Sequence, residues 1–172
     1  MSKFDKWIDC YPDFPKEGIL FRDISPLLAS SEGMSALKKT FVSLISDWEP
    51  DFIAGIDARG FLFSTLIGEA LNTGTLMIRK SGKLPGEVIE GSYNLEYGSN
   101  KLAIQKTNSL KDKKVIIMDD LLATGGTLKC AKDLIESQGA FVPGCAVVVE
   151  LSFLEGSKLL ECPVVSLASY EE

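Results

Sequence analysis

The chain of 172 residues suits one domain with a single substantial core, and its hydrophobic (45%) and charged (24%) contents are those of a globular protein in water. The net charge of −6 argues against general nucleic-acid affinity, and no apolar run approaches the ~20 residues that span a bilayer. The sequence contains no histidine, which excludes histidine-dependent triads, metal sites and general bases. Catalytic proton transfer must therefore use Glu, Asp, Lys, Tyr or water.

The first residues and the cysteines indicate a cellular compartment. Residues 1–7 show none of the apolar stretch of a secretory signal. The cysteines, Cys10, Cys130, Cys145 and Cys162, are widely spaced and form no C-x-x-C pair. We therefore expect a cytoplasmic protein with reduced thiols, and neither a disulfide framework nor a zinc site.

The first half of the chain alternates between helical and strand patterns. Residues 1–30 carry prolines at positions 12, 15 and 26 and are predicted to form an irregular lead segment. Apolar residues at helical spacing predict a helix over 34–48, which Ser30 or Ser31 can cap. A short buried strand over 52–56 follows, and then a helix with its apolar stripe between 63 and 71.

The middle of the chain reads as strands around a loop. Residues 75–78 predict a strand, and residues 80–92, with three glycines and a proline, predict a mobile loop. Two short strands follow, over 92–97 and 101–105, and residues 115–118 form an apolar run that is typical of a strand buried on both faces.

The last third completes the alternation. Apolar spacing predicts a helix over 128–135 that Gly139 terminates, and further strands over 142–151 and 164–167. Strands that alternate with helices predict an α/β fold, in which a doubly wound, mostly parallel sheet is flanked by helices. We expect residues 1–172 to form a single domain.

Two adjacent acids, Asp119 and Asp120, follow the apolar run at 115–118. Ligands of parallel α/β sheets collect beyond the carboxyl ends of the strands, which is where these acids are expected. Two carboxylates at that edge can accept hydrogen bonds from a vicinal diol such as that of a ribose. An acid pair after a strand can also form a Mg²⁺ pocket, or simply be a solvated strand end.

A small-residue loop, Ala123-Thr124-Gly125-Gly126-Thr127, comes next and leads into the predicted helix. Its backbone N–H groups, its two hydroxyls and the positive end of the helix can close around an anion, although the same residues can make an ordinary strand-to-helix connection. The chain contains neither G-x-G-x-x-G nor G-x-x-x-x-G-K-[ST]. Diol acceptors beside a phosphate loop together indicate a site for ribose 5-phosphate.

The segment 115–127 resembles the phosphoribosyl-pyrophosphate (PRPP) motif of type I phosphoribosyltransferases. Other segments are similar to the members of that family that use adenine, and the similarity runs in order from about Tyr11 to Tyr170. These segments are Phe14-Pro15, Gly18–Pro26 (GILFRDISP), Asp57–Phe61 (DARGF), Arg79-Lys80 with Gly82–Gly86 (GKLPG), and Tyr93 with Leu95–Gly98 (LEYG).

The resemblance implies a pyrophosphate site. Asp57, Ala58 and Arg59 would form the loop that faces the leaving pyrophosphate, with the bond between Asp57 and Ala58 often cis in the family. Arg79, Lys80 and Lys83 would add positive charge, partly across the interface of a homodimer, with Arg79 or Lys80 acting on the neighbouring site. Arginine suits bidentate phosphate contacts, and the chain has only three: Arg22, Arg59 and Arg79.

The resemblance also implies a base site and a reaction. Residues 1–30 would form a hood over adenine, in which Leu20, Phe21 and Arg22 read and stack on the base, with Leu121 on its other face. Glu96 is a candidate acid/base, and Arg59 a second catalytic residue. Asp119, Asp120 and residues 123–127 would hold PRPP or AMP, with Mg²⁺ held mainly by PRPP and water and by no direct protein ligand.

Two alternatives remain open from the sequence. Another phosphoribosyltransferase would use xanthine, guanine or orotate, but the segments Gly18–Pro26 and Glu96-Tyr97-Gly98 argue against it. A regulator that only senses PRPP usually carries an added nucleic-acid-binding domain, and the chain has no room for one. The expected activity is therefore transfer of phosphoribose from PRPP to adenine, giving AMP and pyrophosphate in purine salvage, with no membrane or nucleic-acid partner.

Overall fold

The computed structural model describes residues 2–95 and 98–172. Its centre is a seven-stranded sheet in the order β5-β6-β4-β3-β7-β8-β9. Five neighbouring strands are parallel: β4 (Gly74–Lys80), β3 (Phe52–Ile56), β7 (Val115–Leu122), β8 (Cys145–Leu151) and β9 (Val164–Tyr170). An antiparallel pair, β5 (Val88–Leu95) and β6 (Gly98–Gln105), extends the β4 edge. The predicted α/β class and mostly parallel sheet are confirmed.

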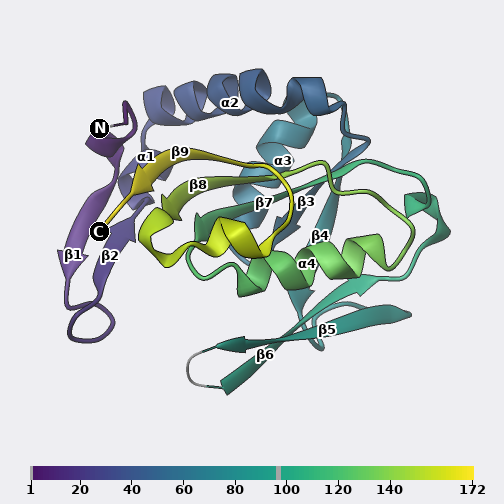
Figure 1. Cartoon of the computed structure of the whole chain (residues 1–172). Coiled ribbons are helices and arrows are strands. Elements are labelled where there is room, and N and C mark those ends of the chain that lie inside the picture. The colour runs from purple at the N-terminus through teal and green to yellow at the C-terminus, as the bar shows by residue number, and fades with distance from the viewer. Residues whose placement is uncertain (1, 96–97) are drawn as a thin grey trace.

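Helices cover both faces of the sheet (Figure 1). On one face lie α2 (Ser31–Ile45) and α3 (Gly60–Ala70), and on the other lies α4 (Gly126–Glu136). Val115 and Ile117 pack toward α4, whereas Ile116 and Met118 pack toward α2 and α3. Because both faces of β7 are buried, apolar residues occupy consecutive positions rather than alternate ones.

The helix that was predicted over 34–48 is α2 followed by a 3-10 turn, Ser46–Trp48. Ser30 is its N-cap, and the Ser30 hydroxyl accepts a hydrogen bond from the backbone N–H of Gly33 at 2.9 Å. This bond satisfies one of the donors that a helix start leaves unpaired, and it confirms the predicted cap.

The N-terminal segment is more regular than predicted. It contains a 3-10 turn (Asp5–Trp7), a hairpin of β1 (Asp9–Pro12) and β2 (Leu20–Asp23), and the short helix α1 (Ser25–Ala29). The expectation of an irregular segment over 1–30 is therefore wrong. β1 is exposed along its whole length and β2 is at most partly buried, so no alternation of buried and exposed residues marked these strands in the sequence. The hairpin stands beside the main sheet, close to the C-terminus (Figure 1).

The predicted mobile loop at 80–92 is also corrected, because β4 ends at Lys80 and β5 begins at Val88. Gly91, counted as a loop glycine, lies inside β5. A Cβ atom there would stand 2.9 Å from the Cys130 sulfur and 3.4 Å from Leu134, because α4 crosses this strand closely. Close helix packing, and not a turn, explains this glycine.

Candidate active site

The acid pair lies within β7 and not beyond its end. The strand continues to Leu122, with Leu121 opposite Val149 and Leu122 opposite Glu150 of β8. The prediction that the strand ends at 118 is therefore wrong. Two adjacent charged residues are typical of a strand end, but here the backbone pairing with β8 continues past them. Both acids still lie in the last half of the strand, near its carboxyl end.

Asp119 is a buried carboxyl group with 9% of its surface exposed. Its Oδ1 accepts a hydrogen bond from the backbone N–H of Asp120 at 2.9 Å. Burial, and next the neighbouring charge of Asp120, raise the pKa of Asp119 well above its ordinary value, while the Arg59 guanidinium acts in the opposite direction. The site therefore holds an acid whose charged form is costly unless a ligand solvates it.

Asp120 forms an ion pair with Arg59, whose Nε donates to Asp120 Oδ2 at 2.5 Å. The Asp120 side chain is 14% exposed and that of Arg59 is 52% exposed. Arg59 precedes α3, so this pair joins the turn after β3 to the adjacent strand β7. The Arg59 side chain is thus paired with one of the two acids of β7 as well as lying on the predicted pyrophosphate turn.

The loop at 123–127 turns directly into α4. Gly125 has φ +85°, a conformation that favours glycine, and a Cβ atom there would stand 2.4 Å from the carbonyl oxygen of Gly156. The loop is therefore packed against the 3-10 turn Gly156–Leu159. The first backbone N–H groups of a helix have no intrahelical acceptor, so this end of α4 presents donors and a positive dipole to an anion.

The turn after β3 brings a second set of predicted residues to the same edge. The Asp57–Ala58 peptide bond is cis, as the resemblance implied. Asp57 Oδ2 accepts from Arg79 Nε at 3.1 Å, and Arg79 Nη1 donates to the backbone oxygen of Lys83 at 3.1 Å. Arg79 therefore connects the Asp57 turn to the 81–87 connection within one chain.

A cavity of about 470 Å³ joins these parts, which is within the usual range for small-molecule sites. It brings together most of the predicted ribose, phosphate and pyrophosphate residues, and one predicted base residue, Leu121. The others are Asp57, Ala58, Arg59, Lys80, Asp119, Asp120, Ala123, Thr124, Gly125, Gly126 and Thr127. Arg79 and Lys83 are not among its lining residues. Glu96 lies outside the described residues.

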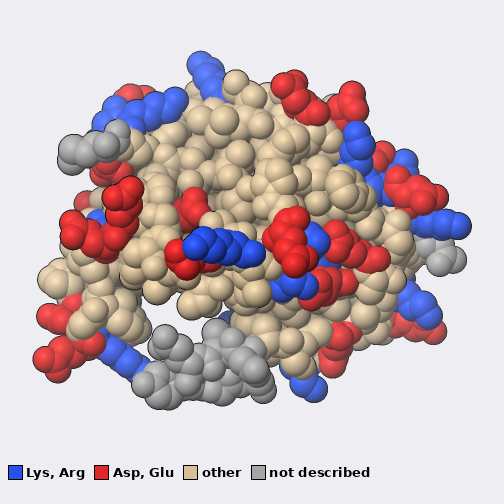
Figure 2. Space-filling view, in the orientation of Figure 1, with Lys and Arg blue, Asp and Glu red and all other residues tan. Residues whose placement is uncertain are grey.

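A second, smaller cavity of about 90 Å³ opens next to the first and shares Arg59, Asp120 and Leu121 with it. Its walls are mostly apolar and include Leu20 and Phe21 from the hairpin. In Figure 2 the surface is hollowed between the N-terminal hairpin and the main body. The hairpin thus stands over the end of β7, and it places the predicted base residues opposite Leu121.

Arg22 lines this smaller cavity, but its guanidinium group is bound elsewhere. It lies over the Tyr170 ring, with Cζ 3.8 Å from the ring centroid, and it donates to the Cys10 sulfur at 2.9 Å and to the backbone oxygen of Glu172 at 3.2 Å. These contacts tie the hairpin to the C-terminus. A role in reading the base would require the side chain to leave them.

Six residues that line the larger cavity were assigned no role in the site by the sequence: Ile56, Tyr93, Asn100, Leu102, Leu122 and Leu128. Tyr93 and Asn100 face each other across the β5–β6 pair. Neither carries a charge, and residues 88–92 of β5 were assigned to the predicted loop. The alternation from Val88 to Leu95 was the one signal that could have revealed this wall.

Comparison with known proteins identifies the family. The model of the phosphoribosyl transferase domain matches residues 24–159. An adenine phosphoribosyltransferase of Gluconobacter oxydans (strain 621H) is 44% identical over 161 residues, covering 94% of this chain and 90% of that protein.

Solved structures of adenine phosphoribosyltransferases are also similar to this chain. Adenine phosphoribosyltransferase from Thermoanaerobacter pseudethanolicus is 38% identical with a TM-score of 0.93, and 98% of each chain is covered. The Saccharomyces cerevisiae enzyme, solved with adenine and an imino-altritol bisphosphate, is 37% identical with a TM-score of 0.92, and 96% of each chain is covered. This chain therefore belongs to the phosphoribosyltransferase family and, within it, to the adenine phosphoribosyltransferases.

Proposed function

We propose that the larger cavity binds PRPP, that the smaller one binds adenine, and that the protein joins them to make AMP and pyrophosphate in purine salvage. The observation that carries this proposal is the junction of the two cavities at Arg59, Asp120 and Leu121. A base beside Leu121 and a sugar on the acid pair would be neighbours. Membership of the adenine phosphoribosyltransferases supports the same substrates.

Asp119 and Asp120 hold the ribose in this proposal, and the loop at 123–127 holds its 5-phosphate. The diol donates hydrogen bonds to the carboxylates, and the phosphate accepts them from the backbone N–H groups at the start of α4. Both parts belong to one strand–loop–helix unit, so a ribose 5-phosphate fixed at two points has little freedom to rotate.

The reaction breaks the bond between the sugar C1 and the pyrophosphate oxygen, and it forms the bond between C1 and adenine N9. Positive charge develops on the sugar, as in glycoside hydrolysis, and the nearby carboxylates favour it. Arg59 and Lys80, which line the cavity, neutralise the departing pyrophosphate. Arg79 holds Asp57 and the 81–87 connection in place.

Mg²⁺ is the metal that this chemistry needs, because it shields the charge on PRPP. Within 2–95 and 98–172, no three acidic or cysteine side chains gather closely enough to hold a metal ion by themselves. Hard oxygen ligands suit Mg²⁺, and PRPP oxygens and water supply them. We therefore propose that it enters with PRPP, near the acid pair.

Changing Arg59 to alanine is expected to slow turnover more than tenfold. The substitution removes charge from the pyrophosphate side and leaves Asp120 without its partner. Steady-state kinetics with PRPP and adenine would measure it. Lys113→Ala is the matched control, since Lys113 pairs with Asp51 at 2.9 Å just before β7, at the opposite end of the strand. A near-normal rate for Arg59→Ala would remove this residue from the site.

The change Glu96→Gln tests the proposed acid/base. Adenine must lose its N9 proton as the new bond forms, and a carboxylate at this position can take it. We expect kcat to fall while adenine affinity is retained, because the amide keeps the size of the side chain but cannot accept the proton. If kcat is unchanged, the proton leaves by another route.

A homodimer is proposed through α3 and β4. Leu62 on α3 and Met77 on β4 are large apolar residues with 50% and 51% of their surface exposed. On its outer edge β4 pairs with β6 only at Arg79 and Lys80, which leaves the remainder of that edge open among the described strands. A partner at this edge would lie beside the two cations that were predicted to reach the neighbouring site.

Met77→Asp is expected to shift the protein from dimer to monomer, because it places a charge in an apolar contact. Analytical ultracentrifugation of the purified chain would measure the shift. Phe141→Asp is the control, since Phe141 is 60% exposed and lies in the α4–β8 connection. Equal sedimentation of wild type and Met77→Asp would contradict the proposed interface.

A panel of bases with PRPP and Mg²⁺, followed by pyrophosphate release, tests the function as a whole. Adenine should react, whereas xanthine, guanine and orotate should not. Binding of PRPP without AMP formation would indicate a regulator instead.

No helix among the described residues is long and apolar enough to cross a bilayer. A cytoplasmic location remains part of the proposal.

A further inference from the structure

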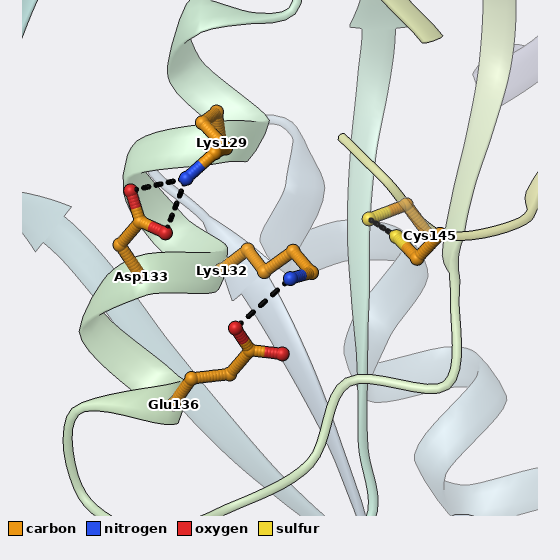
Figure 3. Close-up of polar contacts among 6 residues, drawn as sticks. Lys129, Lys132, Asp133, Glu136 and Cys145 are labelled. Carbon is orange, nitrogen blue, oxygen red and sulfur yellow. Dashed lines mark hydrogen bonds and ion pairs between the residues drawn. The ribbon is translucent and has the colours of Figure 1, made fainter. Parts of the chain in front are cut away.

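Two cysteines lie side by side on the α4 face of the sheet, away from both cavities. Cys145 begins β8, and Cys162 lies two residues before β9. The backbone N–H of Cys145 donates to the oxygen of Pro163 at 2.9 Å, so the two segments are already paired. The two sulfur atoms are 4.0 Å apart, as the dashed contact at Cys145 marks in Figure 3.

The two thiols have different surroundings. Cys145 is fully buried, whereas Cys162 is partly exposed. The hydrogen bond from Cys145 lowers the pKa of Cys162 to about 7, and the Lys132 ammonium acts in the same direction. The hydrogen bond to Cys162, and then burial, raise the pKa of Cys145. Cys162 is therefore the more accessible and the more readily ionised thiol, and Cys145 lies behind it with its proton held more tightly.

Charged side chains of α4 face this pair. Lys132 is 9% exposed, and its Nζ is held by Glu136 Oε2 at 2.9 Å (Figure 3). Lys129 is paired with Asp133 one turn away and does not compete for Glu136. The Glu136 carboxylate opposes the effect of Lys132 on Cys162, so the thiolate is favoured mainly by its cysteine neighbour.

We propose that Cys145 and Cys162 are a peroxide-sensitive thiol pair that closes reversibly to a disulfide. The sulfur atoms must approach from 4.0 Å to about 2 Å, which side-chain rotation and a small movement of the segment before β9 can supply. The bond would close a chain segment that contains Gly156, against which the loop at 123–127 packs. The oxidation state of the pair is thereby linked to the support of that loop.

The oxidation balances with hydrogen peroxide as the oxidant. The Cys162 thiolate attacks one peroxide oxygen, the O–O bond breaks, and the hydroxide that leaves takes a proton to become water. The resulting sulfenic acid is attacked by the Cys145 sulfur. The S–S bond forms, and the Cys145 proton leaves with the sulfenic hydroxyl as a second water. The two sulfurs together give two electrons to the peroxide.

The test uses the whole wild-type protein treated with a small excess of hydrogen peroxide at neutral pH. We expect the intact mass to fall by two hydrogen atoms, peptide mapping to join Cys145 to Cys162, and dithiothreitol to reverse both. The oxidised protein should melt about 5 °C or more above the reduced one, because the bond restricts the unfolded chain. Oxygen adducts on Cys162 without a cross-link, or a cross-link to another cysteine, would overturn the proposal.

Variants separate the two roles. Cys145→Ala should leave a sulfenic acid on Cys162 that a cyclic 1,3-diketone traps, and Cys162→Ala should abolish the loss of two hydrogens. Cys10→Ala removes the exposed cysteine beside Arg22 and should still form the bond. Loss of the bond in Cys10→Ala would assign the chemistry to Cys10 instead. The wild-type peptide map decides the question even if a buried variant folds poorly.

Discussion

Replacing Asp119 with asparagine is expected to stabilise the fold and at the same time to weaken PRPP use more than tenfold. Asparagine keeps the oxygen that accepts the Asp120 N–H at 2.9 Å, but it removes a buried charge. It also loses one charged acceptor for the proposed contact with the ribose diol, and hydrogen bonds to charged groups are about twice as strong as neutral ones. The KM for PRPP and the melting temperature measure the two effects.

The stability effect should depend on pH in a defined direction. Because burial raises the pKa of Asp119, the folded state holds this proton more tightly than the unfolded state does. Its contribution to stability is therefore greatest below the ordinary aspartate pKa of 3.8 and is lost as pH rises through the raised value. The advantage of Asp119→Asn over wild type should therefore grow as pH rises through that window, which melting temperatures measured at several pH values would show.

Asp51→Asn is the matched control with the opposite sign. The backbone N–H of Lys114, and then the Lys113 ammonium, lower the pKa of Asp51 at the other end of the sheet. Its stabilising contribution is present above the ordinary pKa and is lost as pH falls. Asp51→Asn should thus lower the melting temperature at neutral pH and leave KM unchanged. If Asp119→Asn also lowered the melting temperature, the buried Asp119 carboxylate would not destabilise the folded protein.

Asp120→Asn should weaken PRPP use as well, but for an additional reason. It removes the carboxylate that holds Arg59 at 2.5 Å, so both the diol and the pyrophosphate side lose a group. Unchanged kinetics in both Asp119→Asn and Asp120→Asn would refute the proposed diol contact.

Gly125→Ala should have the second large effect, a loss of both stability and PRPP binding. The residue has φ +85°, which costs alanine roughly 1–2 kcal/mol, and its Cβ would stand 2.4 Å from the Gly156 carbonyl oxygen. That neighbour is backbone and cannot rotate away, so the loop at 123–127 must move. A shift of about 1 Å in a positioning loop can cost a factor of about 100.

Gly139→Ala is the control that separates the backbone strain of a positive φ from the steric clash with Gly156. Gly139 has a similar φ of +79°, but its nearest atoms, in Lys111, are 3.6 Å or more from an added Cβ. It should lose stability by roughly 1–2 kcal/mol and keep its KM for PRPP. Thermal melts and PRPP titrations of the two variants would be compared. Equal losses of stability, with PRPP binding intact in both, would show that the contact with Gly156 is unimportant.

Much of the fold could be predicted from the order of residues because it is local. The apolar runs at 52–56 and 115–118 and the stripes of α2, α3 and α4 have the periodicities of strands and helices buried on known faces. The acid pair and the small-residue loop are contiguous, so their spacing alone predicts a diol site beside a phosphate site.

The predictions from the sequence were wrong where contacts between segments far apart in the chain determine the local structure. The continuation of β7 through Asp119 depends on its pairing with β8, and the exposed hairpin depends on β1 meeting β2. Gly91 is required by a helix more than thirty residues later in the chain. None of these contacts leaves a local pattern.

The sequence by itself determined the fold class, the family resemblance and the ribose-phosphate motif, since each depends on residues that are close together in the chain. Only the tertiary structure decided that Asp119 is buried with a raised pKa, that Arg59 pairs with Asp120, and that Arg22 is held by Tyr170. It alone brought Cys145 to Cys162. Charge states and partners depend on burial and on groups far along the chain, and these exist only once the chain has folded.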